Sequence, residues 1–257
     1  MSEVATRPVA LVTGGAKRIG SEIALTLARH GWNVALHYRS SAAEAEQSLR
    51  GLEDAGGQHC LVQADLAHEG QTRAMFALAH ETLGRVDAVI NNAALFDYDD
   101  AHSFDSEKLT AHMLPNLAAP VILAQALHRH VTARDAESTG VVVNLLDQKL
   151  TNLNPDFLSY TLSKSALKTA TMMLAQALAP RVRVVGISPG LTLPSHMQTP
   201  EAFEQTHRMA PLNRSSSPSD IARSVLFLLE SPSITGVDLA VDGGQHLVGM
   251  QRDFSLL

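Results

Sequence analysis

The chain has 257 residues, of which 45% are hydrophobic and 18% charged, with a net charge of −6. Its length fits one large α/β domain better than two small ones, and its acidic balance argues against a nucleic-acid partner. The single cysteine, Cys60, excludes an internal disulfide. No secretory pattern opens the sequence, and its apolar runs fall far short of the roughly 20 residues that span a bilayer. We therefore expect a cytoplasmic protein with no membrane partner.

Short apolar runs alternate with longer helical stretches along the chain. Strands are predicted at Val9–Thr13, Asn33–His37, His59–Ala64, Ala88–Asn91, Val141–Leu145, Arg183–Ile187 and Asp238–Val241. Helices are predicted at Ile19–His30, Ala42–Ala55, Glu69–Leu83, Ser106–Val131, Ser159–Leu178 and Ser219–Leu229. The strands are almost continuously apolar, as strands covered on both faces are. The alternation predicts a single domain over residues 1–257, a Rossmann-like, doubly wound parallel sheet of about seven strands with helices on both faces.

One long stretch, Leu191–Ser217, carries no predicted element and contains Pro194, Pro200 and Pro211. It follows the sixth strand, so it leaves the sheet at the carboxyl edge, where ligands bind in this architecture. Loops of this length in compact domains are usually functional. We predict a substrate loop at about residues 191–217.

A glycine-rich turn joins the first strand to the first helix. It reads Thr13-Gly14-Gly15-Ala16-Lys17-Arg18-Ile19-Gly20. Glycines let the backbone approach a pyrophosphate closely, and a helix N-terminus offers free N–H groups to an anion. The turn predicts a dinucleotide site with contacts from Gly14, Lys17, Arg18, Ile19 and Gly20.

The ends of the next strands indicate which dinucleotide is bound. Arg39 and Ser40 follow the second strand, and no acidic residue occurs there until Glu44. A carboxylate would favour the ribose hydroxyls of NAD, whereas an arginine suits the 2′-phosphate of NADPH. We therefore predict NADPH/NADP+ as the cofactor, with further contacts from Asp65, Leu66, Asn92 and Ala93.

Tyr160 and Lys164 are spaced to lie on one face of a helix. A nearby ammonium favours the phenolate and lowers the pKa of a phenol, which is normally about 10. Such a pair is a plausible proton donor to a carbonyl or imine that receives hydride. The spacing alone is a weak signal, since it arises often by chance.

Five features, taken in order along the chain, resemble the short-chain dehydrogenase/reductase family. They are the glycine turn, Asn91-Asn92-Ala93, Asn116, the Tyr160/Lys164 pair and Pro189-Gly190. The resemblance covers essentially the whole chain. It implies that Tyr160 is the general acid and that Lys164 binds the nicotinamide ribose and tunes Tyr160. It further implies that Asn116 anchors a water relay, that Pro189 and Gly190 pass beside the nicotinamide, and that long apolar helices pair the subunits of a homotetramer.

Two departures from the usual family pattern point to one branch. Arg18 replaces the middle glycine, and Asp147 stands where the catalytic serine is usual, thirteen residues before Tyr160. With Arg39-Ser40, these residues resemble the pteridine reductase and dihydromonapterin reductase branch. Phe96 matches the aromatic that covers a pterin there, which implies that Arg18, Phe96, Asp147 and Tyr160 contact the substrate. Ala94 departs from the branch, which often has serine.

Simpler interpretations stay open for three of these residues. Phe96 could be only a hydrophobic cover, Arg18 could pair with a surface carboxylate, and Asp147 could cap the following loop. An ionised Asp147 would also raise the pKa of Tyr160 and oppose Lys164, so Asp147 is either partly protonated or titrates with Tyr160 as a pair.

The sequence favours NADPH-dependent reduction of a small pterin or dihydropterin. The alternatives are a ketone or 3-oxoacyl reductase and a non-catalytic NADP-binding regulator. None of the histidines has metal-ligand spacing, so no metal is expected.

Overall fold

The computed structural model of the chain describes residues 7–194 and 198–256. Seven parallel strands form one sheet in the order β3-β2-β1-β4-β5-β6-β7. Their bounds are β1 Val9–Val12, β2 Asn33–Tyr38, β3 His59–Gln63, β4 Ala88–Asn91, β5 Gly140–Leu145, β6 Val182–Pro189 and β7 Asp238–Val241. The predicted doubly wound sheet is therefore confirmed, with strand ends shifted by one or two residues.

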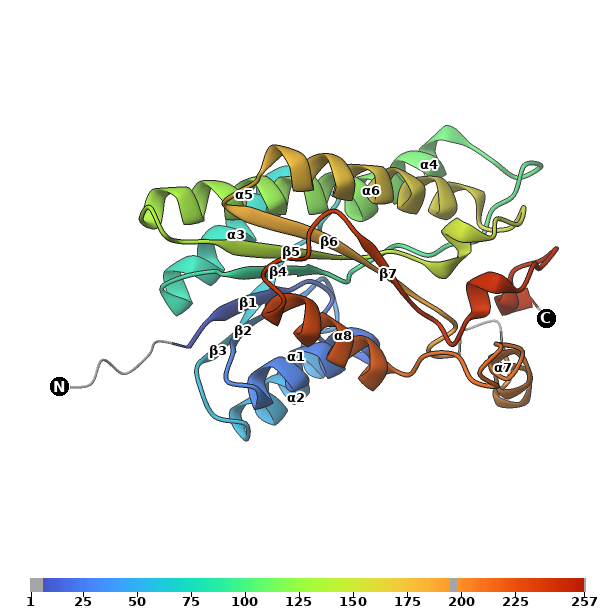
Figure 1. Cartoon of the computed structure of the whole chain (residues 1–257), viewed down its shortest axis with the longest axis horizontal. Helices are drawn as coiled ribbons and strands as arrows, with labels where there is room; N and C mark the ends of the chain where they lie inside the picture. Colours follow the sequence, from blue (N-terminus) through green and yellow to red (C-terminus); the bar gives the residue numbers. More distant parts are fainter. Residues whose placement is uncertain (1–6, 195–197, 257) are drawn as a thin grey trace.

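Helices cover both faces of the sheet (Figure 1). They are α1 Arg18–Arg29, α2 Ala42–Glu53, α3 Glu69–Leu83, α4 Ser106–Met113, α5 Ala119–Arg134, α6 Leu158–Ala177, α7 Pro200–His207 and α8 Pro218–Glu230. One core layer packs α1, α2 and α8 on the sheet, and a second packs α3, α5 and α6 on the other face. None of the helices in the described part of the chain is both long and apolar enough to cross a membrane.

The strand order reverses direction at β1, which pairs with β2 on one side and β4 on the other. The connections from these strands leave in opposite directions and open a crevice at the carboxyl ends of β1 and β4. The fold therefore places the glycine turn after β1 beside the segment after β4.

The predicted helix over Ser106–Val131 is wrong as one continuous element. A π-helical turn at Leu114–Ala118 separates α4 from α5. Pro115 lies in this turn, and a proline inside a helix lacks an N–H donor and clashes with the preceding turn. The widened turn accommodates Pro115, and it carries Asn116 to a buried position.

The stretch 191–217 is not wholly irregular, because it contains α7. Thr199 caps this helix by accepting a hydrogen bond from Ala202 N, and Pro200 occupies the first turn, where a missing N–H costs nothing. Residues 195–197 of the predicted substrate loop lie outside the described residues. In Figure 1, α7 and the C-terminal segment lie together at one end of the sheet.

Candidate active site

The glycine turn is held between the ends of β1 and β4. Gly14 has a φ of +62°, and a Cβ on Gly20 would lie 2.1 Å from the Gly14 carbonyl oxygen. The Asn92 amide donates to the carbonyls of Thr13 and Gly14, at 3.0 and 3.1 Å. The Thr13 hydroxyl oxygen accepts from the backbone N–H groups of Asn92 and Ala93. Glycine is therefore required at Gly20 by space and favoured at Gly14 by conformation.

His37 supports the same turn, a role that sequence analysis missed. Its Nδ1 accepts a hydrogen bond from Gly14 N at 3.0 Å, and its Nε2 lies 3.1 Å from the Ala64 carbonyl oxygen. Because Nδ1 accepts, Nε2 must carry the proton, and the ring is neutral. Burial lowers the pKa of His37, which keeps the neutral form at neutral pH. The only signal in the sequence was a histidine at the end of an apolar strand.

Protonation of His37 would remove the acceptor that holds Gly14. Since its pKa is lower in the folded chain than its unfolded value of about 6.5, the stability from neutral His37 is present above that value and is lost as the pH falls through the folded pKa. We expect the melting temperature of the wild type to fall with acidification more steeply than that of a His37→Gln variant. The exposed His102→Gln is the control. Identical pH dependence in His37→Gln and the wild type would contradict this role.

Arg18 begins α1 in a left-handed conformation, with a φ of +58°. Its guanidinium donates to the Pro194 carbonyl at 3.2 Å, at the start of the substrate loop. The surface carboxylate that an alternative interpretation offered as its partner is not found among the described residues. A side chain in this conformation costs about 1 kcal/mol relative to glycine, so Arg18 is kept against a local penalty.

An Arg18→Gly variant is expected to fold at least as stably as the wild type, with a gain of about 1 kcal/mol. It should nevertheless bind NADPH more weakly, because a cation at the helix N-terminus is lost. Thermal melting and a fluorescence titration with NADPH measure the two effects. Asn213→Gly is the matched control, since Asn213 has a φ of +55° and does not line the cavity. Unchanged NADPH affinity in Arg18→Gly would contradict a cofactor contact.

A cavity of about 950 Å³ opens at the carboxyl edge of the sheet. All predicted site residues except Asn116 line it, namely Gly14, Lys17, Arg18, Ile19, Gly20, Arg39, Ser40, Asp65, Leu66, Asn92, Ala93, Phe96, Asp147, Tyr160, Lys164, Pro189 and Gly190. Arg39 and Ser40 are exposed at the end of β2, where a charged group of a ligand could reach them. The described residues contain no group of three or more His, Cys, Asp or Glu side chains placed to hold a metal ion.

Asp147, Tyr160 and Lys164 meet on one side of this cavity. The Tyr160 hydroxyl donates to Asp147 Oδ2 at 2.8 Å, and Asp147 Oδ1 accepts from Lys149 N at 2.8 Å. Lys164 Nζ donates to the Leu145 carbonyl at 2.6 Å and lies 5.8 Å from the centroid of the Tyr160 ring. Asp147 thus caps the following turn, as the simpler interpretation held, and also binds Tyr160.

Comparison with known proteins matches this arrangement to a family. A family model described as enoyl-(acyl carrier protein) reductase matches residues 14–246. Pteridine reductase 1 of Leishmania tarentolae is 32% identical, over 96% of this chain and 99% of its own. The chain is a short-chain dehydrogenase/reductase.

Two solved structures resemble this short-chain dehydrogenase/reductase over nearly its whole length. The FolM alternative dihydrofolate reductase 1 of Brucella suis, in complex with NADP, is 45% identical with a TM-score of 0.89, covering 96% of this chain and 98% of its own. The protein of the same name from Brucella canis, complexed with NADP, is 44% identical with a TM-score of 0.87, covering 95% and 96%. The resemblance to the pteridine reductase branch is therefore confirmed.

Burial and Asp147 decide the protonation of Tyr160 in this short-chain dehydrogenase/reductase. Burial raises the pKa of Tyr160 well above its usual value, and the negative charge of Asp147 raises it further. Burial also raises the pKa of Asp147, against hydrogen bonds from Lys149 N and Tyr160, and lowers the pKa of Lys164 to about 8. Lys164 therefore does not make Tyr160 a phenolate here, because desolvation and Asp147 outweigh it. The phenol is neutral and donates a hydrogen bond to Asp147 Oδ2.

Asn116 lies behind the cavity. Its Oδ1 accepts from Leu95 N at 2.8 Å, and its Nδ2 donates to the Leu95 carbonyl at 3.0 Å and to Ser163 Oγ at 2.9 Å. These contacts tie the segment after β4 to α6, which positions the walls on both sides of Tyr160. The predicted water relay through Asn116 stays a prediction.

Phe96 packs in an aromatic cluster at the cavity wall. Its ring stacks on Phe157, with centroids 4.2 Å apart, and lies nearly perpendicular to the Tyr160 ring, with centroids 4.7 Å apart. Phe157 is fully buried, while Phe96 is half-buried and faces the cavity. Phe96 therefore covers the core and also offers an apolar surface to a ligand. Sequence analysis missed Phe157, which has no motif of its own.

Proposed function

We propose that this short-chain dehydrogenase/reductase reduces a pterin or dihydropterin with NADPH. The observation that carries the proposal is the hydrogen bond between the Tyr160 hydroxyl and the Asp147 carboxylate in the cavity. A carboxyl beside the phenol suits a substrate whose ring nitrogen must gain a proton. The names of the Leishmania and Brucella relatives add support, because both refer to reduction of pterin-type rings.

The residues around the glycine turn fit a dinucleotide phosphate. The turn opens on the N-terminus of α1, where free N–H groups and the helix dipole attract an anion. Lys17, Arg18 and Arg39 add positive charge along the same rim of the cavity. In this proposal Arg39 and Ser40 bind the 2′-phosphate, Asp65 and Leu66 lie against the adenine, and Pro189 and Gly190 lie beside the nicotinamide. Bound NADPH supplies the hydride.

The catalytic residues supply and orient the proton. Tyr160 keeps its proton because its pKa is raised, and Asp147 takes up protons more readily than an exposed carboxyl because its pKa is raised too. The two groups titrate as a pair and deliver one proton to the ring nitrogen beside the carbon that receives hydride. Solvent then restores the proton to the pair. Phe96 holds the flat ring by stacking, and Lys164 holds the cofactor ribose.

A panel of substrates tests the proposal. NADPH oxidation is followed with dihydropterins and dihydrofolate, and separately with 3-oxoacyl thioesters and simple ketones. We expect turnover of at least one pterin and a preference for NADPH over NADH. Failure to reduce any pterin would overturn the proposal, and activity confined to ketones or 3-oxoacyl thioesters would favour that second class. Tight NADPH binding without turnover would favour a regulator.

We further propose that the protein is a homotetramer. An apolar groove on α5 and α6 includes Val121, Ile122, Ala166, Ala170 and Met173, and Met173 is 65% exposed. A second copy that packs on this face would cover the groove. Multi-angle light scattering should give four chains per particle for the wild type and fewer for Met173→Glu. A monomeric wild type would contradict the assembly.

A further inference from the structure

The C-terminal segment folds back and forms part of the substrate side of the cavity. Asp253, Phe254 and Ser255 line the cavity together with Asp147 and Tyr160. Phe254 and Ser255 are each only 6% exposed. The Phe254 carbonyl accepts a hydrogen bond from Gln198 Nε2 at 2.7 Å, which joins the segment to the substrate loop. The segment is therefore a packed wall of the site.

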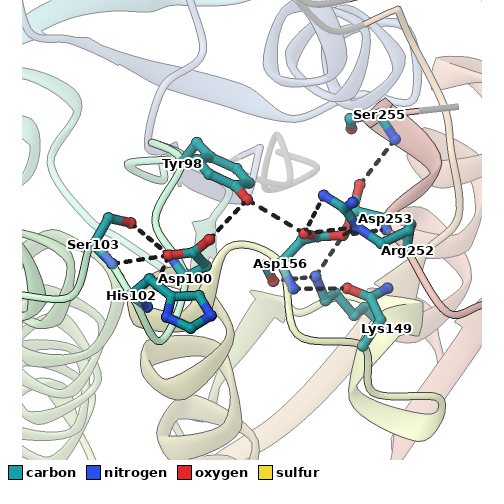
Figure 2. A network of polar contacts seen from close by, with 10 residues as sticks. Tyr98, Asp100, His102, Ser103, Lys149, Asp156, Arg252, Asp253 and Ser255 are labelled. Atoms are coloured by element: carbon teal, nitrogen blue, oxygen red, sulfur yellow. Dashed lines mark hydrogen bonds and ion pairs between the residues drawn. The ribbon is translucent and has the colours of Figure 1, made fainter.

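A buried carboxylate clamps this segment in place. Arg252 donates through Nε and Nη2 to both oxygens of Asp156, at 2.9 to 3.1 Å, and Asp253 N donates to Asp156 Oδ2 at 2.7 Å (Figure 2). Asp156 is 2% exposed. A forked arginine on a carboxylate fixes direction as well as distance. The clamp therefore fixes the backbone at Asp253 and the direction in which the Asp253 side chain points.

Asp253 then reaches the catalytic pair through Lys149. Lys149 is 3% exposed, and its Nζ lies 2.9 Å from Asp253 Oδ2 and donates to the Asp156 carbonyl. Within the described residues, Asp253 is the one carboxylate paired with this ammonium. The backbone N–H of the same Lys149 donates to Asp147 Oδ1 at 2.8 Å. Because a buried ammonium needs its counter-charge, losing Asp253 would shift Lys149 and the hydrogen bond that orients Asp147.

We propose that Asp253 is a positioning residue of the active site, which holds Lys149 so that Lys149 N keeps Asp147 aligned with the Tyr160 hydroxyl. The proposal depends on the proposed function for the identity of the substrate, but the geometry it concerns is that of the free protein. It also assigns a task to the last turn of the chain, which completes the wall of the cavity.

The charges around Asp147 give this role an electrostatic signature. Burial, and then Asp253, raise the pKa of Asp147, while Lys149 N, Tyr160 and Lys164 lower it. Asp253 also raises the pKa of Tyr160, after burial and Asp147. Removal of the Asp253 charge alone would lower the pKa of Asp147, whereas loss of the Lys149 N hydrogen bond would raise it. The hydrogen bond is the larger of these two causes, so the positioning role predicts a higher pKa of Asp147 when Asp253 is replaced.

Carbon-13 NMR of the aspartate carboxyls tests this without any substrate. The Asp147 signal is assigned by its absence in Asp147→Asn, and its titration is compared in the wild type and Asp253→Asn. We expect the apparent pKa of Asp147 to be higher in Asp253→Asn, because the Lys149 N hydrogen bond is weakened, and restored in Asp253→Glu. Asp54→Asn, an exposed carboxyl on α2's C-terminus, is the control and should leave the titration unchanged. An apparent pKa of Asp147 that is unchanged or lower in Asp253→Asn overturns the proposal, because a lower value would report only the lost charge.

Kinetics give the second measurement. In Asp253→Asn, kcat should fall about tenfold, because a small misalignment of a proton donor is costly. The limb of its pH profile that reports Asp147 should move to higher pH, with the KM for NADPH unchanged. An unaltered kcat and pH profile would contradict the positioning role. If Asp253→Asn fails to fold, Arg252→Gln is the second variant, because it loosens the clamp and leaves the charge of Asp253. Hydrogen exchange at residues 252–256 and kcat are then measured. If both are unchanged in Arg252→Gln, the positioning role is overturned. If the wild-type protein does not reduce any pterin, the proposed function is refuted. The NMR titration still decides whether Asp253 positions Asp147, because it needs no substrate.

Discussion

Replacement of Tyr160 by phenylalanine is expected to lower kcat about a thousandfold, within the range that general acid catalysis contributes. Only the hydroxyl that donates to Asp147 Oδ2 is lost, and the edge contact with Phe96 is kept. The affinity for NADPH should therefore stay the same. Stopped-flow measurement of hydride transfer, together with a fluorescence titration of NADPH, separates the two effects.

Tyr98→Phe is the matched control for this experiment. Tyr98 loses the same hydroxyl, but its contacts with Asp100 and Asp156 are long, at 3.4 Å, and it does not line the cavity. It should retain nearly full activity. A Tyr160→Phe variant with wild-type turnover would exclude Tyr160 as the proton donor and would favour a non-catalytic function.

Asp147→Asn is expected to have two opposite effects. Turnover of a pterin should fall about a hundredfold, because the amide cannot take up and release the proton. Stability at neutral pH should rise. The folded-state pKa of Asp147 is raised above its unfolded value, so its contribution to stability is present at low pH and is lost as the pH rises through the folded pKa. Asparagine carries no charge at any pH, so the Asp147→Asn variant does not lose this stability as the pH rises. Melting curves across pH and steady-state kinetics measure the two effects.

Asp147→Ser, which restores the usual family residue, completes this test. It removes the carboxylate that raises the pKa of Tyr160, so the alkaline limb of the pH profile should move to lower pH. Pterin turnover should fall as in Asp147→Asn, while any reduction of simple ketones should be retained or increased. An Asp147→Ser variant with wild-type pterin activity and an unchanged alkaline limb would remove Asp147 from the mechanism.

The sheet and the cofactor side of the cavity were predictable because their signals are local. Buried parallel strands appear as continuous apolar runs, and the glycines between Thr13 and Gly20 stand between a strand and a helix. The break at Pro115 was missed because the apolar pattern continues through it on both sides. The helix α7 was not predicted because Pro200 is one of several prolines in this stretch, although a proline in the first turn starts a helix well.

The remaining features depend on contacts between distant parts of the chain. The partner of Arg252 is Asp156, 96 residues away, and nothing near Arg252 in the sequence indicates it. The sequence left the balance between Lys164 and Asp147 at Tyr160 open, because helical spacing gives the nearness of Lys164 but not the burial that governs the pKa. Sequence patterns thus identified the side chains, whereas burial set their protonation.

The hydrogen bonds from Asn92 to the glycine turn bear on how the protein folds. Asn92 contacts Thr13 and Gly14 across separations of 79 and 78 residues. Ordering the turn therefore requires β4 to be paired with β1, and contacts of such long range form late because a large loop must close first. During synthesis, a nascent chain that has emerged only through β3 would lack these bonds. We expect dinucleotide binding to appear as a late event in refolding, after most of the helical signal has returned.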